Sequence, residues 1–462
     1  MSKPTEFTMG KLKSGRRAVR GGGQMLNRRG LMLGAGAGLL GLGATSAHSQ
    51  ATEARWWESI FDPLANNRAQ PPPRPVQDTL NDLRPDSVPL RSDVMLQQMD
   101  AAVDRYQKIV SRGGWTPIPA GRQMRPGDDD PRVPYVRRRL VISGDHRLYG
   151  DGFNMSSRFD GELEEAVKRF QESFGLRTTG RVDPPTLAQL NVSAHARLEQ
   201  LRLNQRRIRE LMQLRAEDRY VLVNVPGFQL EAVEGHEVRL RHRVIVGKPD
   251  RQTPSVRTSI RALNFFPYWR VPDSIAKLDL IPRLQKEPEY LDKEKIKAFN
   301  GFGGPEIDLA SVDWRQVDTN KVKFRQEPGP QNALGLVRID MPNEHIVYLH
   351  DTPMKPLFGQ RARAFSAGCV RVQDVFELVE WIARYEPGWE NPGRVQEVIA
   401  AGQPLDLTLT RQIPVYFTYI TAWAEADGRV EFRPDIYGRD GSREFAGEHD
   451  SEAPAPPVTL AP

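Results

Sequence analysis

Cysteine is almost absent from this sequence, because Cys369 is the only one among 462 residues. A single cysteine cannot form an intrachain disulfide bond, so the fold is not stabilised by such bonds. A lone cysteine is usually a small buried apolar residue, and only its surroundings can indicate a nucleophile. The stretch FSAGCVRV, residues 365–372, therefore has to be interpreted with the rest of the chain.

Long hydrophobic runs are also missing. The most apolar stretch, residues 31–43, is rich in glycine and too short to span a membrane. No second stretch of this kind follows, so we expect no transmembrane segment in the mature protein.

Most of the chain has no net positive charge, although the whole sequence carries a formal net charge of +6. Residues 1–29 contain eight Lys or Arg and one acidic residue, which leaves 57 basic and 58 acidic residues in the remainder. The high pI thus belongs to the N-terminal arm. The composition of the folded body therefore indicates no nucleic-acid partner.

The N-terminal arm has the pattern of an export signal. Arg28 and Arg29 precede the apolar stretch, and small residues follow it at 44–51. This arrangement is typical of a twin-arginine signal, with an ordinary secretory signal as the alternative. We therefore predict a periplasmic, cell-wall-associated protein. Because that compartment is oxidising, a single thiol there is easier to explain if it takes part in chemistry.

Composition and periodicity divide the chain into segments, and the apolar period changes from 3.6 to 2 near Arg219. The predicted segments are an export signal (1–50), a linker with an N-terminal helical scaffold (51–135), a three-helix module (136–192), a linker helix (193–217), a mostly β domain with a partly helical insertion at about 272–335 (218–440), and a disordered tail (441–462). The predicted fold class is therefore α+β and multidomain.

The three-helix module has clear helix-start signals. Asp160 and Asp183 are predicted N-caps, and Pro184 occupies the first position of the third helix. The segment FDGELEEAVKRFQESFGLRTTGRVDPPTLAQLN, residues 159–191, resembles the peptidoglycan-binding module of cell-wall enzymes along its whole length. The resemblance implies binding to peptidoglycan glycan and stem peptides. A generic helical bundle is the alternative.

A reactive thiol needs a base or a positive charge beside it. Two histidines, His345 and His350, lie in the predicted strand 345–351 before Cys369. They are five residues apart, so their side chains point to opposite faces of a strand, and Tyr348 shares the face of His350. This geometry excludes a metal site made of the two histidines and the cysteine, and we expect no metal.

The stretch YLHDTPMKPLFGQRARAFSAGCVRV, residues 348–372, resembles the catalytic signature of the L,D-transpeptidases with a YkuD-type domain. In that signature a histidine precedes Ser/Thr-x-Gly-Cys-(aliphatic)-Arg/Asn. The stretches FPYWRVPDSIA, LIPRLQKEPEYL and RQEPGPQNALG resemble the large YcbB-like branch, in which an insertion covers the active site. Many members of the wider family have His-Gly-Cys, whereas this chain has Ala367 in place of that histidine. His350 is then the only motif histidine available.

The resemblance implies a role for each motif residue. Cys369 is the nucleophile, and His350 either takes its proton or forms a thiolate–imidazolium pair with it. The other implied site residues are four in oxyanion or support roles (Gly368, Ser366, Asp351, Tyr348) and three in substrate binding (Arg371, Arg363, Phe358).

Several of these assignments have alternatives. The backbone N–H groups around Gly368 would donate to an oxyanion. The two arginines either bind stem-peptide carboxylates or make structural hydrogen bonds. Ser366 and Tyr348 either polarise the site or have a packing or turn role. Asp351 could hold the imidazole tautomer through its side chain or through its backbone carbonyl.

The implied reaction is acyl transfer without metal or cofactor. Cys369 would attack the amide after the third residue of a tetrapeptide stem, release D-Ala, and pass the acyl group to an amine of a neighbouring stem. The resemblance also implies acylation of Cys369 by carbapenems. Two alternatives stay open: an L,D-carboxypeptidase or endopeptidase, in which water is the acceptor, and a non-catalytic cell-wall-binding scaffold.

Overall fold

The computed structural model describes residues 83, 88–145, 156–214, 217–309, 312–318 and 320–441. The predicted export signal, most of the proline-rich linker and nearly all of the predicted tail lie outside the described residues. Within the described ranges, no helix is long and apolar enough to cross a membrane.

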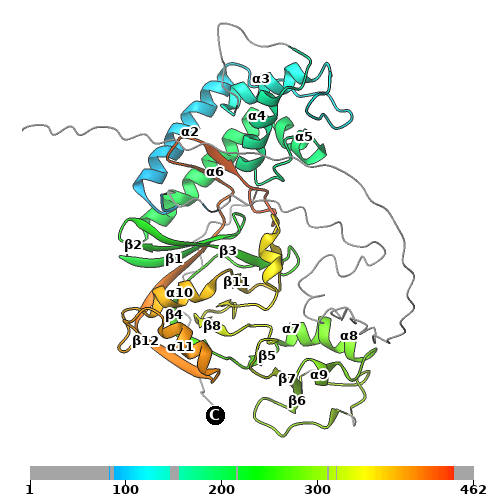
Figure 1. Ribbon diagram of the computed structural model, residues 1–462, viewed down its shortest axis with the longest axis vertical. Coiled ribbons are helices and arrows are strands. Elements are labelled where there is room, and N and C mark those ends of the chain that lie inside the picture. Colours follow the sequence, from blue (N-terminus) through cyan, green and yellow to red (C-terminus); the bar gives the residue numbers. More distant parts are fainter. Residues whose placement is uncertain are drawn as a thin grey trace, which may run out of the picture. The chain divides into compact units, whose positions relative to one another are not determined.

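The N-terminal part of the described chain is helical (Figure 1). Its helices are α2 (Asp93–Ser111), α3 (Val133–Ser143), α4 (Gly161–Ser173), α5 (Pro184–Asn191) and α6 (Ala194–Gln213). The predicted caps are confirmed, because the side chain of Asp160 accepts from the Leu163 N–H and that of Asp183 from the Thr186 N–H. Pro184 stands at the first position of α5, where no intrahelical N–H donor is needed.

The helices share one hydrophobic core with parts of the chain that lie far away in sequence. Leu198, Leu201 and Ile208 place one side of α6 in this core, and Phe170 belongs to it from α4. The hairpin of β13 (Ala422–Ala424) and β14 (Val430–Phe432) also packs into this core. The last strands of the chain thus return to the helices rather than joining the main sheet.

The main sheet has nine strands in the order β10-β3-β11-β9-β8-β4-β12-β1-β2, and β2 also pairs with β3. Its strands are β1 (Arg219–Asn224), β2 (Gln229–Glu234), β3 (Glu237–Gly247), β4 (Val256–Phe265), β8 (Val337–Asp340), β9 (Leu349–His350), β10 (Ala364–Ser366), β11 (Val370–Val372) and β12 (Leu405–Thr418). Because β3 pairs with both β2 and β11, the pairings form a closed circuit, with β10 added alongside β3.

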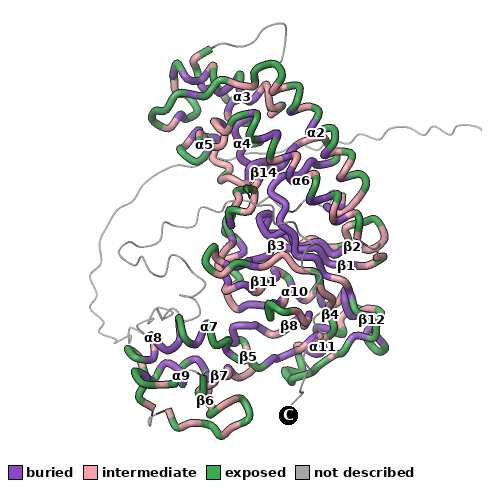
Figure 2. The backbone as a smooth tube through the Cα atoms, turned by 180° about the vertical axis from the view of Figure 1, so that it is seen from behind, coloured by how far each residue is buried: buried purple, intermediate pink, exposed green. Residues whose placement is uncertain are grey.

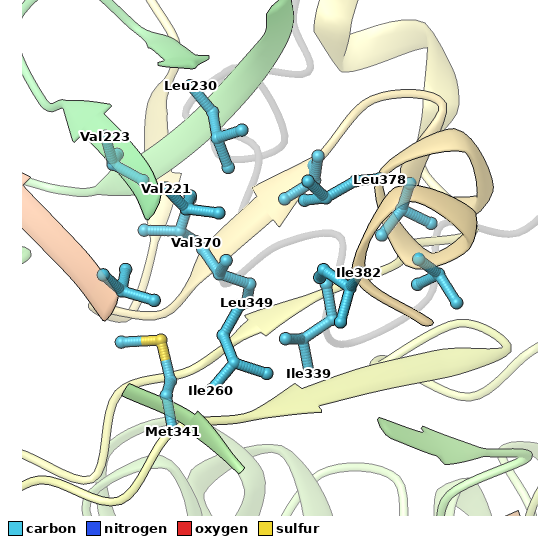
Figure 3. Packing of buried hydrophobic residues seen from close by; sticks show 14 of the residues in the cluster. Val221, Val223, Leu230, Ile260, Ile339, Met341, Leu349, Val370, Leu378 and Ile382 are labelled. Carbon is cyan, nitrogen blue, oxygen red and sulfur yellow. The ribbon is translucent and has the colours of Figure 1, made fainter. Parts of the chain in front are cut away.

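The core of this sheet is aliphatic, and Figure 3 shows its centre, where Leu349 and Val370 lie between Val221 and Ile382. Figure 2 shows most of β1 and β2 and the C-terminal residues 244–247 of β3 in purple, because they are buried. Helix α10 (Val375–Ala383) covers part of the core with Leu378 and Ile382. Helix α11 (Arg394–Ala401) also packs there and was not predicted.

The predicted insertion forms a small subdomain with its own core. Its elements are β5 (Trp269–Arg270), α7 (Asp273–Ile275), the π-helical turn η1 (Ala276–Leu280), α8 (Ile281–Leu284), α9 (Tyr290–Lys293), β6 (Ile296–Asn300) and β7 (Val322–Gln326). Strands β5, β7 and β6 make a three-stranded sheet. The fold class is therefore confirmed: α+β, with a helical module, a mostly β domain and a partly helical insertion.

The strand predicted over residues 345–351 is wrong in its length. Only Leu349–His350 forms a strand, because Ile346 has a φ of +53° and interrupts the extended backbone. Ile346 is 78% exposed, whereas Val347 is buried in the main core. The regular alternation of side chains thus begins only at Val347.

Candidate active site

Strand register gathers the motif residues on one face of the main sheet. Strand β9 pairs in parallel with β11, so His350 lies opposite Arg371 and Leu349 opposite Val370. Leu349 and Val370 point into the core, so His350 and Arg371 point away from it. Cys369 and Tyr348 immediately precede these pairs and are hydrogen-bonded to each other.

Cys369 directly precedes β11, and His350 ends the adjacent strand β9. Both residues come from rigid strand ends, which fixes their mutual orientation. The predicted nucleophile and base therefore lie on the same face of the sheet, one strand apart.

His350 is buried and held in one tautomer. Its Nδ1 lies 2.5 Å from the backbone carbonyl oxygen of Asp351, so Nδ1–H donates and Nε2 is left as a proton acceptor. Burial, followed by the positive charge of the nearby Arg371 guanidinium, lowers the pKa of His350 to about 3. The imidazole is therefore neutral at physiological pH.

The side chain of Asp351 does not hold the imidazole. Its carboxylate accepts a hydrogen bond from the Leu336 N–H at 3.0 Å and forms an ion pair with Lys355. Of the two possibilities left open by the sequence, the backbone carbonyl of Asp351 is the group that holds the imidazole tautomer.

The Cys369 thiol is partly exposed and also neutral at physiological pH. Burial of its surroundings raises the pKa of Cys369 to about 11, although hydrogen bonds from the backbone and side chain of Tyr348 act in the opposite direction. The thiol and the imidazole are therefore both uncharged in the resting state, rather than a thiolate and an imidazolium. The thiol lies 3.9 Å from the carbonyl oxygen of Ile346, to which it donates. A reaction with Cys369 as the nucleophile would need a base that takes the thiol proton during the attack.

Tyr348 connects the motif to the insertion. Its side chain packs against both the main core and the insertion core, and its ring lies 5.6 Å from that of His350. Its hydroxyl group is hydrogen-bonded to Cys369 and to Trp269 of β5. Burial raises the pKa of Tyr348 well above its usual value of 10, so the hydroxyl stays protonated and can donate. The sequence did not indicate the part played by Trp269.

Two arginines supply positive charge to this face. Arg371 is 1% exposed, and its guanidinium contacts the hydroxyl of Thr352 at 3.4 Å. Burial lowers the pKa of Arg371 to about 9, which still leaves it charged at neutral pH. Arg338, opposite His350 on β8, lies over the Tyr348 ring at 5.5 Å. Such fixed charges would stabilise negative charge that develops on sulfur or on an acyl oxygen.

Ser366 stabilises the turn of residues 366–369, which we call the nucleophile turn. Its hydroxyl donates to the carbonyl oxygen of Cys369 at 2.5 Å and accepts from the Gly368 N–H at 3.1 Å. Ser366 is buried, so its role is to close the turn. The Gly368 N–H is therefore occupied and is not the free oxyanion donor that we expected. The Cys369 N–H makes no hydrogen bond to any residue that the structure describes, so it is the donor available at this turn.

Two of the residues predicted to bind substrate, Arg363 and Phe358, have structural contacts instead. The Arg363 guanidinium donates to the carbonyl oxygens of Val244, Gln360 and Phe228 at 3.3, 2.8 and 3.0 Å. This is the structural alternative that the sequence left open. Phe358 lies in the 3₁₀ helix η3 (Lys355–Gly359) and is 3% exposed, so its ring is not available to a substrate.

The residues that the structure describes contain no group of three or more His, Cys, Asp or Glu side chains that could hold a metal ion. The arrangement is instead suited to nucleophilic acyl transfer: a partly exposed thiol, a buried neutral base with a fixed tautomer, and positive charge nearby.

Comparison with known families agrees with this chemistry. Residues 218–399 match the family model of the YkuD L,D-transpeptidase catalytic domain. This segment is therefore similar to L,D-transpeptidase catalytic domains. Residues 130–190 match the model described as "Putative peptidoglycan binding domain", which overlaps the predicted three-helix module. The matched segment 218–399 contains every motif residue discussed above.

The alignment with an individual relative covers only part of this chain and part of the relative. The "Putative L,D-transpeptidase" of Haemophilus influenzae is 31% identical over 257 residues, which is 55% of this chain and 50% of the relative. The chain thus spans about half the length of that curated relative.

Solved L,D-transpeptidase structures are more distant. One from Stackebrandtia nassauensis is 13% identical with a TM-score of 0.24, covering 66% of this chain and 97% of its own. One from Mycobacterium smegmatis is 10% identical with a TM-score of 0.21, covering 44% and 58%. At these TM-scores the likenesses carry no argument about this chain.

Proposed function

We propose that this protein is a periplasmic L,D-transpeptidase that cross-links peptidoglycan by cysteine acyl transfer. The matched catalytic domain, together with the matched peptidoglycan-binding domain, supports this substrate class. The observation that carries the proposal is the single face on which β9 and β11 place Cys369, His350, Tyr348 and Arg371.

The first step forms a thioester. As Sγ of Cys369 bonds to the carbonyl carbon after the third stem residue, the thiol proton passes to Nε2 of His350. The resulting oxyanion is stabilised by the Cys369 N–H and by the positive charge of Arg371 and Arg338. The intermediate collapses when the C–N bond breaks, and His350 returns the proton to the leaving D-Ala amine.

The second step transfers the acyl group. An amine of a neighbouring stem attacks the thioester carbon and gives a proton to His350, the C–S bond breaks, and the thiol regains its proton. The insertion lies beside the thioester, because Tyr348 and Ala367 both pack against its core. A bidentate ion pair from Arg251 to Asp279 of η1, at 2.6 and 3.1 Å, ties it to the β3–β4 loop. This placement would limit the access of water, the competing acceptor.

The test is to incubate the protein with disaccharide-tetrapeptides and to identify products by mass spectrometry. We expect a cross-linked dimer that lacks one D-Ala, and no dimer from Cys369→Ala. His350→Ala should lose activity, whereas His345→Ala, a matched substitution at an exposed histidine, should retain it.

Other products would change the conclusion. Tripeptide alone would mean that water is the acceptor and that the protein is an L,D-carboxypeptidase. Dimer formation that persists in Cys369→Ala would exclude the cysteine as nucleophile. No product from either protein would favour a cell-wall-binding scaffold.

Two further parts of the proposal have their own tests. A carbapenem should add its mass to the wild-type protein and not to Cys369→Ala. Replacement of the paired arginines by lysine, Arg28→Lys with Arg29→Lys, should block export if the signal is of the twin-arginine type.

A further inference from the structure

The carbonyl group of Gly368 is held by a residue from a distant loop. Thr253, in the loop between β3 and β4, donates from its Oγ1 to the Gly368 carbonyl oxygen at 2.7 Å. The same Oγ1 accepts a hydrogen bond from the Gly247 N–H at 2.8 Å. Thr253 is completely buried, so no water can replace this donor without rearrangement.

Tyr437, near the end of the described chain, fixes this threonine. Its hydroxyl accepts from the Thr253 N–H at 3.2 Å and donates to the Gly247 carbonyl oxygen at 2.6 Å. The Tyr437 N–H in turn donates to the Tyr419 hydroxyl at 2.8 Å. Thr253 is therefore held at both its backbone and its side chain.

The direction of the Gly368 carbonyl determines the direction of the Cys369 N–H. Both groups belong to the same planar peptide unit, in which a trans C=O and N–H point in opposite directions. Gly368 has a φ of +118°, a conformation open to glycine, and such a residue gives little resistance to rotation of the adjacent peptide. A hydrogen bond to the carbonyl is thus what keeps this peptide unit in one orientation.

We propose that Thr253 is a positioning residue that orients the Gly368–Cys369 peptide so that the Cys369 N–H serves as the oxyanion donor. The inference rests on the proposed function in one respect only, namely that Cys369 is the acylated nucleophile. It extends the catalytic machinery to the β3–β4 loop and, through Tyr437, to the C-terminal segment that follows β14.

The test compares two reactions of the same thiol in the full-length protein. Acylation by p-nitrophenyl acetate passes through a tetrahedral oxyanion, whereas alkylation by iodoacetamide does not. Because Cys369 is the only cysteine, the part of each rate that is lost in Cys369→Ala reports this thiol. Loss of one oxyanion donor slows acyl transfer about 10²-fold or more. We therefore expect Thr253→Val to slow acylation to that extent and to change alkylation by less than about twofold.

Two variants separate positioning from folding. Thr253→Ser keeps the hydroxyl group and should restore acylation. Thr418→Val is the matched control, because the buried Thr418 hydroxyl also donates to a backbone carbonyl, that of Val223 at 3.1 Å, in strands away from the turn. It should change neither rate. An equal decrease of both rates in Thr253→Val, or unchanged acylation, would overturn the inference.

The result does not depend on the peptidoglycan activity. If the wild-type protein makes no cross-links but Thr253→Val still separates acylation from alkylation, the proposed function fails and the inference stands. If cross-links form and the two rates do not separate, the inference fails and the proposed function stands.

Discussion

The ionisation of Cys369 gives the sharpest prediction. Burial raises the pKa of this thiol to about 11 and lowers that of His350 to about 3, so both groups are neutral in the resting site. A thiolate–imidazolium pair would require the opposite shifts. The rate of alkylation by iodoacetamide as a function of pH distinguishes the two states, because only the thiolate reacts.

The expected magnitude follows from the pKa. At pH 7 a thiol with a pKa near 11 is about one part in 10⁴ thiolate, against about one part in 10² for an ordinary thiol near 9. The more basic thiolate is also the stronger nucleophile. A Brønsted coefficient of about 0.4–0.5 raises the rate constant of the thiolate roughly tenfold, which offsets part of the hundredfold smaller thiolate fraction. We therefore expect alkylation about tenfold slower than for an ordinary thiol.

The assay measures alkylation by mass spectrometry between pH 6 and pH 10.5, with the urea-unfolded protein as the ordinary-thiol control. The logarithm of the rate in the folded protein should rise with unit slope through pH 9 and show no plateau below pH 10. A plateau reached by pH 8 would mean a stable thiolate at neutral pH. It would refute the general-base assignment of His350 and favour the ion pair.

Three further predictions concern buried polar side chains of the catalytic-domain segment. Ser366→Ala leaves the bonded N–H and carbonyl of the nucleophile turn without their partner, so urea unfolding should show a loss of about 1–3 kcal/mol together with slower acylation. Arg363→Met removes the donor to three backbone carbonyl groups, two of them buried, and should destabilise the fold by roughly 3 kcal/mol. A rise in KM without loss of stability would instead indicate substrate binding. Burial lowers the pKa of His242 to about 4, below its usual 6.5, so the unfolded state binds the proton first and stability should fall by roughly 3 kcal/mol as the pH drops from 6.5 to 4. His242→Leu should remove that part of the pH dependence of the unfolding midpoint, and an unchanged pH dependence would contradict the burial argument.

The sequence was sufficient for some features that depend on neighbouring residues, although it missed the break in the strand at Ile346. The N-caps at Asp160 and Asp183 depend on an N–H group three residues ahead, so their pattern is local and correctly predicted. The shared face of Tyr348 and His350 follows from the period of two along an extended chain. The sequence therefore indicated that Tyr348 and His350 share a face, while the position of Cys369 relative to that face comes from the pairing of β9 with β11.

Contacts that depend on pairing between distant segments could not be predicted from the sequence. Thr253 reaches Gly368 because β3 pairs with β10 and β11, and Tyr437 arrives from beyond the main sheet. A buried threonine in a loop has no periodic signal, and a tyrosine near the C-terminus gives no indication of the carbonyl that it contacts. Arg363 was misleading for a related reason, because an arginine in a catalytic motif suggests a ligand for carboxylates. Its guanidinium is in fact buried among backbone carbonyls.

The departure at Ala367 has a physical explanation in the insertion. The Ala367 side chain packs against the insertion core, which contains Trp269, Phe324 and Leu334. A histidine at this position would have to bury a polar ring against that apolar cluster, at a cost unless it found hydrogen-bond partners there. Alanine instead lets the nucleophile turn contact the insertion directly. The loss of the second motif histidine and the presence of the insertion are therefore parts of one arrangement. In that arrangement no second imidazole is present at the turn, so the oxyanion donor and the base that we propose are the Cys369 N–H and His350, the first held by the Thr253 side chain and the second by the Asp351 carbonyl oxygen.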